Sequence, residues 1–336
     1  MVNFVNIASP DWSPADSYGR IARELMQVLQ SRDVWVNQFG GNLPERMKIK
    51  PALGGFLLGY PTLHNRYHVI TQKGSPRVAI TMFEATVIPA EWIEPLNACD
   101  AVIVPSQFLV DVFRDCGVTT PIHVVPLGIS EAFHKPVLRQ RSKPFTFLCI
   151  GDRGTRKGWW DTARAFNMLF GDDMNYRLVI KSRTFHITLT NPNIEIIEDD
   201  YTDEQMCELY QRAHVLMFPT KGEGFGFPPR EMAATGGVAM ATNWSGTADD
   251  IDCWGVPMQP IAMEQAFEDH NVEFAGRVGQ WAAPFGCEGV AAYMQHVVDD
   301  YEQYAKRAFR QASWVHEHYR WSDFVDGCWR VYESLL

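Results

Sequence analysis

The sequence predicts an α/β protein with two doubly wound parallel sheets, and three observations lead to this prediction. Short apolar runs alternate with longer segments of helical periodicity along most of the chain, which is typical of parallel strands joined by helices. A polar stretch with two prolines, residues 134–144, interrupts this alternation, which then resumes. A length of 336 residues fits two domains of ordinary size.

The first half of the chain is expected to form strands at the apolar runs and helices at the segments with helical spacing. In order, these are strand 2–8, helix 17–29, strand 34–36, strand 77–83, helix 90–97, strand 101–104, helix 107–116 and strand 122–125. The segment 40–63 shows no readable period. We place the end of this domain near residue 140.

The second half follows the same alternation. We expect strand 145–150, loop 151–157, helix 158–170, strands 177–180 and 194–197, helix 202–212, strand 215–218, a helix from 229 and strand 238–241. Ligands bind beyond the carboxyl ends of the strands in such sheets, so two domains that face one another would share a central cleft. Functional residues should therefore follow strands.

Composition excludes several classes of protein. The chain has 46% hydrophobic and 21% charged residues, which is typical of a globular protein and not of a disordered one. Its net charge of −10 disfavours an overall electrostatic grip on nucleic acid or anionic membranes. Seven dispersed cysteines without a C-x-x-C pair indicate neither a disulfide framework nor a zinc site. With no signal peptide and no apolar run of transmembrane length in the sequence, we expect a cytoplasmic protein.

The densest functional pattern is the segment 218–231, FPTKGEGFGFPPRE. Two of its glycines, Gly224 and Gly226, surround Phe225 and precede a helix opened by two prolines, where proline is favourable. Backbone N–H groups in such a loop and the positive end of the helix attract a phosphate or an oxyanion. Glu223 and Glu231 bracket the loop and could bind two separate sets of sugar hydroxyls.

This E-x(7)-E pattern resembles the signature of the family-four retaining glycosyltransferases, which have the GT-B fold of two Rossmann-like domains. Similar landmarks cover most of the chain: FEATVIPAEW at 83–92, VPSQF at 104–108, VPLGI at 125–129 and WSDF at 321–324. The resemblance implies that Glu223 contacts the transferred sugar and Glu231 the ribose, while the amides of 224–226 touch sugar hydroxyls and diphosphate. It also implies an acceptor-binding domain 1–140, a donor-binding domain 141–319 and a closing helix 320–336 that packs on the first domain.

A second, basic segment follows the first strand of the second domain. Arg153, Arg156 and Lys157 lie within five residues, and the leaving diphosphate of a donor needs such cations. Gly151, Lys157 and Gly158 match the family's G-x(5)-K-G pattern, in which an arginine and the lysine bind the diphosphate. The position after the glycine, a common place for that arginine, is Asp152 here, so Arg153 is the preferred candidate and Arg156 the alternative.

Other candidates rest on the resemblance and on their places after strands. Glu84 would contact sugar or acceptor, with helix capping as the equal alternative, and Gly19 with Arg20 would lie opposite the diphosphate. Arg183 and Tyr201 would contact the base and ribose, or be ordinary polar loop ends. No metal site is expected, because Asp250 and Asp252 read as helix-terminal or loop acids and the histidines lack metal-ligand spacing.

The predicted activity is transfer of a sugar from a UDP- or GDP-hexose to a hydroxyl acceptor, with retention, by same-face attack and without a metal or other cofactor. A phosphorylase of the same architecture and a nucleotide-sugar-binding protein without turnover are the alternatives. The acceptor is expected to be a glycan or another hydroxyl compound. A nucleic acid or lipid phosphate stays open, although the net charge of −10 disfavours either.

Overall fold

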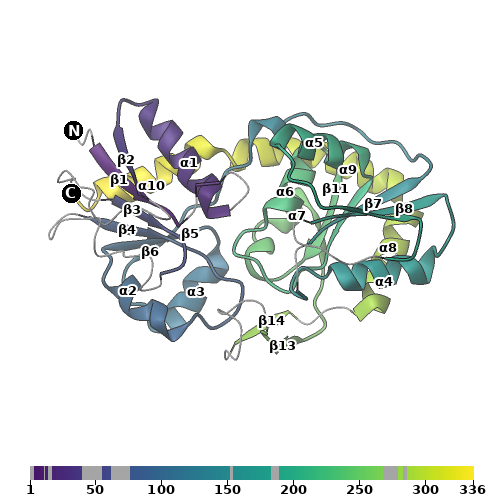
Figure 1. Cartoon of the computed structure of the whole chain (residues 1–336), viewed down its shortest axis with the longest axis horizontal. Coiled ribbons are helices and arrows are strands. Elements are labelled where there is room, and N and C mark those ends of the chain that lie inside the picture. Colours follow the sequence, from purple (N-terminus) through teal and green to yellow (C-terminus); the bar gives the residue numbers. More distant parts are fainter. Residues whose placement is uncertain are drawn as a thin grey trace. The chain divides into compact units, whose positions relative to one another are not determined.

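A computed structural model of the chain describes residues 4–10, 12–13, 17–39, 55–61, 76–151, 154–182, 189–267, 279–282 and 286–336. The chain divides into two compact units (Figure 1). The first comprises Met1–Phe83, Val87–Gly128 and Tyr319–Leu336, and the second comprises Glu84–Thr86 and Ile129–His318. A short segment that follows the fourth strand of the first unit therefore belongs to the second.

The first unit is a parallel sheet with helices. Its elements are β1 (Phe4–Ala8), α1 (Ser17–Gln30), β2 (Trp35–Phe39), β3 (Gly55–Leu58), β4 (Arg77–Ile80), the 3-10 helix η3 (Ala90–Trp92), α2 (Ile93–Asn97), β5 (Ala101–Val104), α3 (Gln107–Asp115), β6 (Ile122–Val124) and α10 (Trp321–Glu333). The strand order is β2-β1-β3-β4-β5-β6, and every pair is parallel. Helix α10 packs against α1 of this unit.

The second unit has the same plan. Its elements are η4 (Glu131–Phe133), β7 (Phe145–Ile150), α4 (Trp159–Leu169), β8 (Tyr176–Lys181), β9 (Ile194–Ile197), α5 (Asp203–Arg212), β10 (Val215–Phe218), α6 (Phe227–Ala234), β11 (Val238–Thr242), η5 (Ser245–Thr247), α7 (Ile251–Trp254), β12 (Val256–Met258), β13 (Met263–Gln265), β14 (Gln280–Ala282), α8 (Gly286–Asp299) and α9 (Tyr301–His318). The six-stranded parallel sheet has the order β12-β11-β10-β7-β8-β9. The short strands β13 and β14 form a separate antiparallel pair.

The predicted fold class of two doubly wound parallel sheets is confirmed. The structure adds elements that the sequence did not reveal: β3 within the segment without a readable period, the β13–β14 pair, and helices α8 and α9. The strand predicted at 77–83 ends earlier, at Ile80.

Local sequence explains why these elements form. Helix α1 buries Ile21, Ala22, Leu25 and Leu29 along one face, which is the spacing of an amphipathic helix. Helix α5 begins with a capping box in which Thr202 and Gln205 bond one another's backbone N–H. Strands β5 (AVIV) and β10 (VLMF) are apolar and buried at every position, which is typical of strands in a parallel sheet with helices on both faces.

The core of the second unit lies on both sides of its sheet. Alternate residues of β7, β8, β10 and β11 pack with α4, α8 and the first half of α9 on one side, and α5 and α6 lie on the other (Figure 1). Arg139 anchors the chain that leads into β7, because its guanidinium donates to the carbonyl of Tyr210 at 2.8 Å and to that of Thr235 at 3.0 Å. Because helices cover both faces of the sheet, polar side chains that could bind a ligand are expected at the carboxyl ends of its strands.

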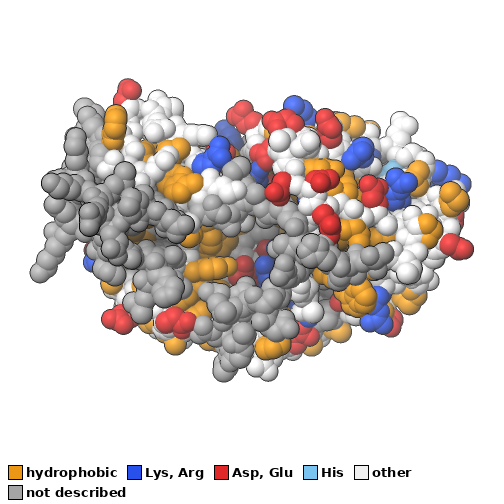
Figure 2. All heavy atoms as spheres, viewed as in Figure 1, with side chains coloured by type: hydrophobic (Ala, Val, Ile, Leu, Met, Phe, Trp, Pro, Cys, Tyr) orange, Lys and Arg blue, Asp and Glu red, His pale blue; other side chains and the backbone are white. Residues whose placement is uncertain are grey.

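On the surface of the second unit shown in Figure 2, acidic and basic side chains are interspersed among polar and apolar ones. Among the described residues, no helix combines the length and apolarity that crossing a bilayer requires.

Candidate active site

The glycine-rich segment predicted from the sequence forms the loop between β10 and α6. Helix α6 begins at Phe227 with prolines in its first turn. Proline costs nothing there, because N–H groups in the first turn of a helix have no intrahelical acceptor. Gly226 precedes the helix with a left-handed φ of 87°, and a Cβ there would lie 2.7 Å from the side chain of Thr247. Only glycine suits this turn, which brings the loop over the carboxyl end of β10.

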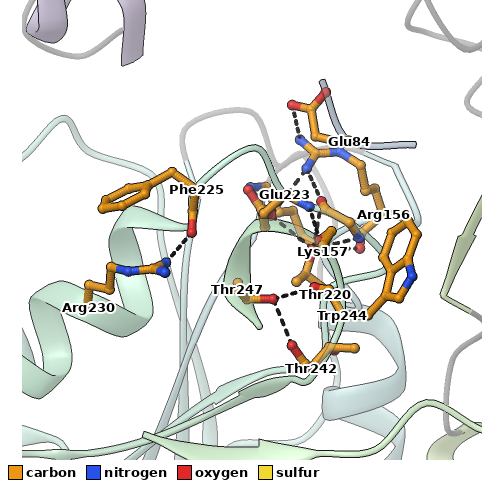
Figure 3. Close-up of polar contacts among 12 residues, drawn as sticks. Glu84, Arg156, Lys157, Thr220, Glu223, Phe225, Arg230, Thr242, Trp244 and Thr247 are labelled. Carbon is orange, nitrogen blue, oxygen red and sulfur yellow. Dashed lines mark hydrogen bonds and ion pairs between the residues drawn. The ribbon is translucent and has the colours of Figure 1, made fainter. Parts of the chain in front are cut away.

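Glu223 is the centre of the polar contacts in this loop (Figure 3). Its Oε1 accepts a hydrogen bond from Lys157 Nζ at 2.6 Å, from Arg156 Nη1 at 3.1 Å and from Thr220 Oγ1 at 2.9 Å. The residue is 7% exposed. A buried carboxylate with two cations and a hydroxyl is paired and hydrogen-bonded, as burial of a charge requires.

Arg156 joins Glu223 to a second carboxylate. Its Nη2 lies 3.8 Å from Glu84 Oε1, and its Nη1 also donates to the carbonyl of Gly222 at 2.7 Å (Figure 3). A Cβ on Gly222 would lie 2.0 Å from the carbonyl oxygen of Glu84. The structure therefore brings Glu84, which follows a distant strand in the sequence, into the second unit beside the glycine-rich loop.

Two loops touch through their backbones to make this cluster possible. The N–H of Lys221 donates to the carbonyl of Arg156 at 2.7 Å. Gly158, with a φ of 67°, approaches so closely that a Cβ would lie 2.2 Å from the carbonyl oxygen of Pro219. The loop after β7 and the loop after β10 are thus fixed together at the same edge of the sheet, since parallel strands end on one side.

Burial and pairing set the charge state of the cluster. Burial by itself would raise the pKa of Glu223, but the attraction of Lys157 and Arg156 and the hydrogen bonds from Lys157 and Thr220 outweigh it, so the pKa lies below its ordinary value of 4.5. Burial lowers the pKa of Lys157, opposed by the attraction of Glu223. Glu223 is therefore ionised at neutral pH and cannot serve as a proton donor there.

The loop also presents backbone donors. Within the described part of the chain, the N–H groups of Gly224 and Gly226 have no acceptor although both residues are buried. Buried N–H groups are almost always satisfied in proteins, by water or ligand where protein acceptors are lacking. Together with the start of α6, these donors could hold an anion or hydroxyl oxygens.

Glu231 lies on α6 and is held separately from Glu223. Its Oε2 accepts a hydrogen bond from the hydroxyl of Tyr210 at 2.7 Å, and the residue is 6% exposed. The neighbouring residue, Arg230, is fully buried and donates to the carbonyls of Phe225, Gly226, Gly246 and Asp249. Its guanidinium also lies over the rings of Phe225 and Trp254. Arg230 thus ties the glycine-rich loop to the loop after β11.

The remaining predicted residues fall in several places. Gly151 follows β7, and a Cβ there would lie 2.9 Å from Cβ of Trp159. Tyr201 lies after β9, with Nζ of Lys181 5.2 Å from its ring centre. Gly19 and Arg20 lie in α1 of the first unit. Arg153 and Arg183 lie outside the described residues, so the arginine seen beside Lys157 is Arg156, the sequence-based alternative.

Two residues that contact Glu223 and Glu231 were not predicted from the sequence. Thr220 and Tyr210 bond Glu223 and Glu231. The hydroxyl of Thr220 lies three residues before a motif glutamate, which is a usable local signal. Tyr210 lies on another helix, α5, and its contact depends on how α5 packs against α6, for which a single sequence carries no signal.

The two aspartates considered as a possible metal motif lie elsewhere. Asp250 is the N-cap residue that precedes α7, and Asp252 lies within that helix, as expected for helix-terminal acids. Among the residues that the structure describes, no group of three or more His, Cys, Asp or Glu side chains could hold a metal ion.

Comparison with known proteins places this geometry in a structural context. No family model matches the chain. The sequence is 31% identical over 99 residues to the serotype-specific mannosyltransferase WbdA of Escherichia coli, a match that covers 26% of this chain and 12% of that protein. It is 25% identical over 135 residues to a putative glycosyltransferase 41 of a Sulfolobus islandicus filamentous virus, covering 40% of this chain and 38% of that protein. The chain thus spans only a minor part of these relatives.

Solved structures match over the whole chain. Sucrose-phosphate synthase from Thermosynechococcus elongatus has a TM-score of 0.75 at 13% identity and covers 99% of both chains. Anabaena HepE, solved with UDP and glucose, has a TM-score of 0.70 at 11% identity, covering 98% of this chain and 99% of that one. The chain therefore has the GT-B fold. At these identities the likeness shows the fold alone.

Replacing Glu223 by Gln should destabilise the protein in a pH-dependent way. A carboxylate with a lowered pKa contributes stability that is present above pH 4.5 and is lost as the pH falls through the lowered value. Leaving Lys157 and Arg156, whose side chains are 20% and 16% exposed, without their charged partner should cost about 2 kcal/mol at pH 7. Urea unfolding of both proteins between pH 7 and pH 3.5 should show the difference shrink in acid.

The matched control is Glu195→Gln. Glu195 and Arg177 form an ion pair at 3.6 Å in which both side chains are about half exposed, so its loss should change stability by less than about 0.5 kcal/mol. Equal effects of the two substitutions, or a Glu223→Gln effect that does not depend on pH, would contradict the charge state assigned to Glu223.

Proposed function

We propose that this chain is a retaining glycosyltransferase that moves a hexose from a nucleoside diphosphate sugar to a hydroxyl acceptor. The observation that carries the proposal is the cluster at the carboxyl edge of the second sheet. There, an ionised Glu223 lies between Lys157 and Arg156, beside the amides of Gly224 and Gly226, for which the described residues supply no acceptor. These groups offer cations and N–H donors to a diphosphate and a carboxylate to sugar hydroxyls.

The donor class is supported by the arrangement of the motif residues. Glu223 and Glu231, which the family resemblance assigns to the sugar and the ribose, are both held by hydrogen bonds on either side of the same loop. The partial relatives are a mannosyltransferase and a glycosyltransferase, and HepE was solved with UDP and glucose. We propose a UDP- or GDP-hexose as donor and membership of family four.

The proposed role of the cations is to stabilise the leaving group. As the bond from the anomeric carbon to the diphosphate breaks, negative charge grows on the departing oxygen. Lys157, with Arg156 and the amides of the loop, would stabilise this charge, and donors fixed before the reaction are commonly worth about 3–4 kcal/mol each. No metal is required for this step because the chain supplies the positive charge itself.

Retention is proposed to follow from attack on the face that the diphosphate leaves. The departing phosphate oxygen would take the proton of the acceptor hydroxyl, so the chain supplies no dedicated base. Glu223 already accepts three hydrogen bonds, which suits a residue that orients sugar hydroxyls better than one that attacks carbon. The acceptor is proposed to be a glycan or another compound with a free hydroxyl.

Lys157→Ala should mainly reduce turnover. Loss of a cation at the leaving group removes stabilisation that is greatest in the transition state, so kcat for donor hydrolysis should fall by about 10²–10³-fold. The exposed Lys306 is a matched control, because Lys306→Ala removes a cation from the surface of α9. Release of nucleoside diphosphate measures both; near-normal turnover of Lys157→Ala would remove its assignment.

Glu231→Ala should mainly weaken donor binding. A carboxylate that holds the ribose contributes similarly before and during the reaction, so KM for the donor should rise about tenfold with kcat changed less than about threefold. Tyr210→Phe, which keeps the carboxylate and removes its hydrogen bond, serves as the comparison and should have a smaller effect. A fall in kcat without a change in KM would speak against ribose binding.

Treatment with EDTA should leave transfer activity unchanged. The proposed stabilisation of the diphosphate depends on Lys157 and Arg156 and not on a divalent ion. Activity is compared before and after dialysis against the chelator, with and without added Mg²⁺ or Mn²⁺. A strict requirement for a divalent ion would contradict this account and make Asp250 and Asp252 candidate metal ligands.

A further inference from the structure

The loop that follows β11 contains a serine in a conformation unusual for its type. Ser245 has a φ of 61°, a region that residues with a Cβ rarely adopt. The residue is 3% exposed. Backbone strain of this kind persists where the surrounding structure enforces it, and it concentrates at functional sites.

Contacts around Ser245 hold the main chain of Glu223 on both sides. Oγ of Ser245 accepts a hydrogen bond from the N–H of Glu223 at 2.9 Å, and the N–H of Gly246 donates to the carbonyl of Glu223 at 2.9 Å. A Cβ on Gly246 would lie 2.2 Å from the carbonyl oxygen of Gly224. The two loops are therefore in contact backbone to backbone, with Glu223 clamped between two neighbouring residues.

Further hydrogen bonds hold the same loop, so the backbone of Ser245 cannot relax without breaking them. Thr247 Oγ1 donates to the carbonyl of Thr242 at 2.7 Å and to that of Trp244 at 2.8 Å. Arg230 Nη2 donates to the carbonyl of Gly246 at 3.0 Å. These contacts hold the chain on either side of Ser245 and explain how its φ is maintained.

We propose that Ser245 is a positioning residue for the transfer reaction, which acts by fixing the main chain of Glu223. This inference rests on the proposed function. Oε1 of Glu223 reaches its three donors from a main chain whose N–H and carbonyl are both held by Ser245 and Gly246. Small errors in the position of a substrate-contacting group reduce turnover strongly. In this proposal, the strained conformation of Ser245 is what keeps the carboxylate of Glu223 in position.

Two substitutions separate the hydrogen bond from the strain. Ser245→Gly removes Oγ and relieves the unfavourable φ, whereas Ser245→Ala removes Oγ and keeps it. Both variants lose the same hydrogen bond and only Ser245→Gly relieves the strain, so its thermal midpoint should lie about 2–4 °C above that of Ser245→Ala. Both variants should lower kcat for donor hydrolysis by about tenfold. A residue that only supported the fold would instead lower stability and leave kcat unchanged.

A double-mutant cycle tests whether Ser245 acts through Glu223. Ser245→Gly is introduced into the wild type and into Glu223→Gln, and kcat for donor hydrolysis is measured in all four proteins. Because residues that act as one unit are not additive, Ser245→Gly should change kcat by less than about twofold in the Glu223→Gln background. The dissociation constant for the nucleoside diphosphate product should stay within about twofold.

Asp250→Gly is the matched control for relief of strain. Asp250 has a φ of 55° in the same part of the chain, and its side chain makes no capping hydrogen bond to α7. This substitution should raise the thermal midpoint without changing kcat.

The outcomes separate this inference from the proposed function. A wild-type kcat in Ser245→Gly, or an equal loss in the Glu223→Gln background, would overturn the role of Ser245 while leaving the glycosyltransferase assignment in place. Failure of the wild type to release nucleoside diphosphate from any donor would overturn the proposed function and this role with it.

Discussion

The arrangement of the second unit depends on the burial of one carboxylate. Glu223 is 7% exposed and ionised, and a buried charge is tolerated only with close partners. Lys157, Arg156 and Thr220 are those partners. These partners come from the loops after β7 and β10, which are in backbone contact where Gly158 leaves no room for a Cβ. The charge of Glu223 is thus compensated only while these two loops keep their positions.

A second layer of buried polar contacts holds the loops that carry the charges. Arg230 donates hydrogen bonds to carbonyls of both the glycine-rich loop and the loop after β11. Oγ of Ser245 accepts a hydrogen bond from the N–H of Glu223. Preorganisation of this kind lets fixed groups stabilise charge without rearranging during a reaction. Contacts of this kind suit a site whose turnover depends on the exact positions of its charged groups. In this account, the strained Ser245 belongs to these contacts because it holds the main chain of Glu223.

Much of the fold and part of the candidate site could be predicted from local sequence, and the remainder could not, for physical reasons. The alternation of strands and helices gave both sheets, and the motif gave Glu223 and Lys157. Strand β3 was missed because four residues starting with glycine carry no recognisable period. Spacing alone could not show that Arg156 lies beside Glu223, because this contact depends on how two distant loops meet. Tyr210 was missed for the same reason. The preference for Arg153 stays a prediction because that residue lies outside the described ones.

The central claim is that this chain cleaves a nucleoside diphosphate sugar with retention at the anomeric carbon. The direct test is proton NMR of the wild-type protein with UDP- and GDP-hexoses, recorded before the released sugar mutarotates. The account predicts release of nucleoside diphosphate with a free sugar, or a transfer product, of the same anomeric configuration as the donor. Release of the opposite anomer, or no cleavage of any donor, would contradict it.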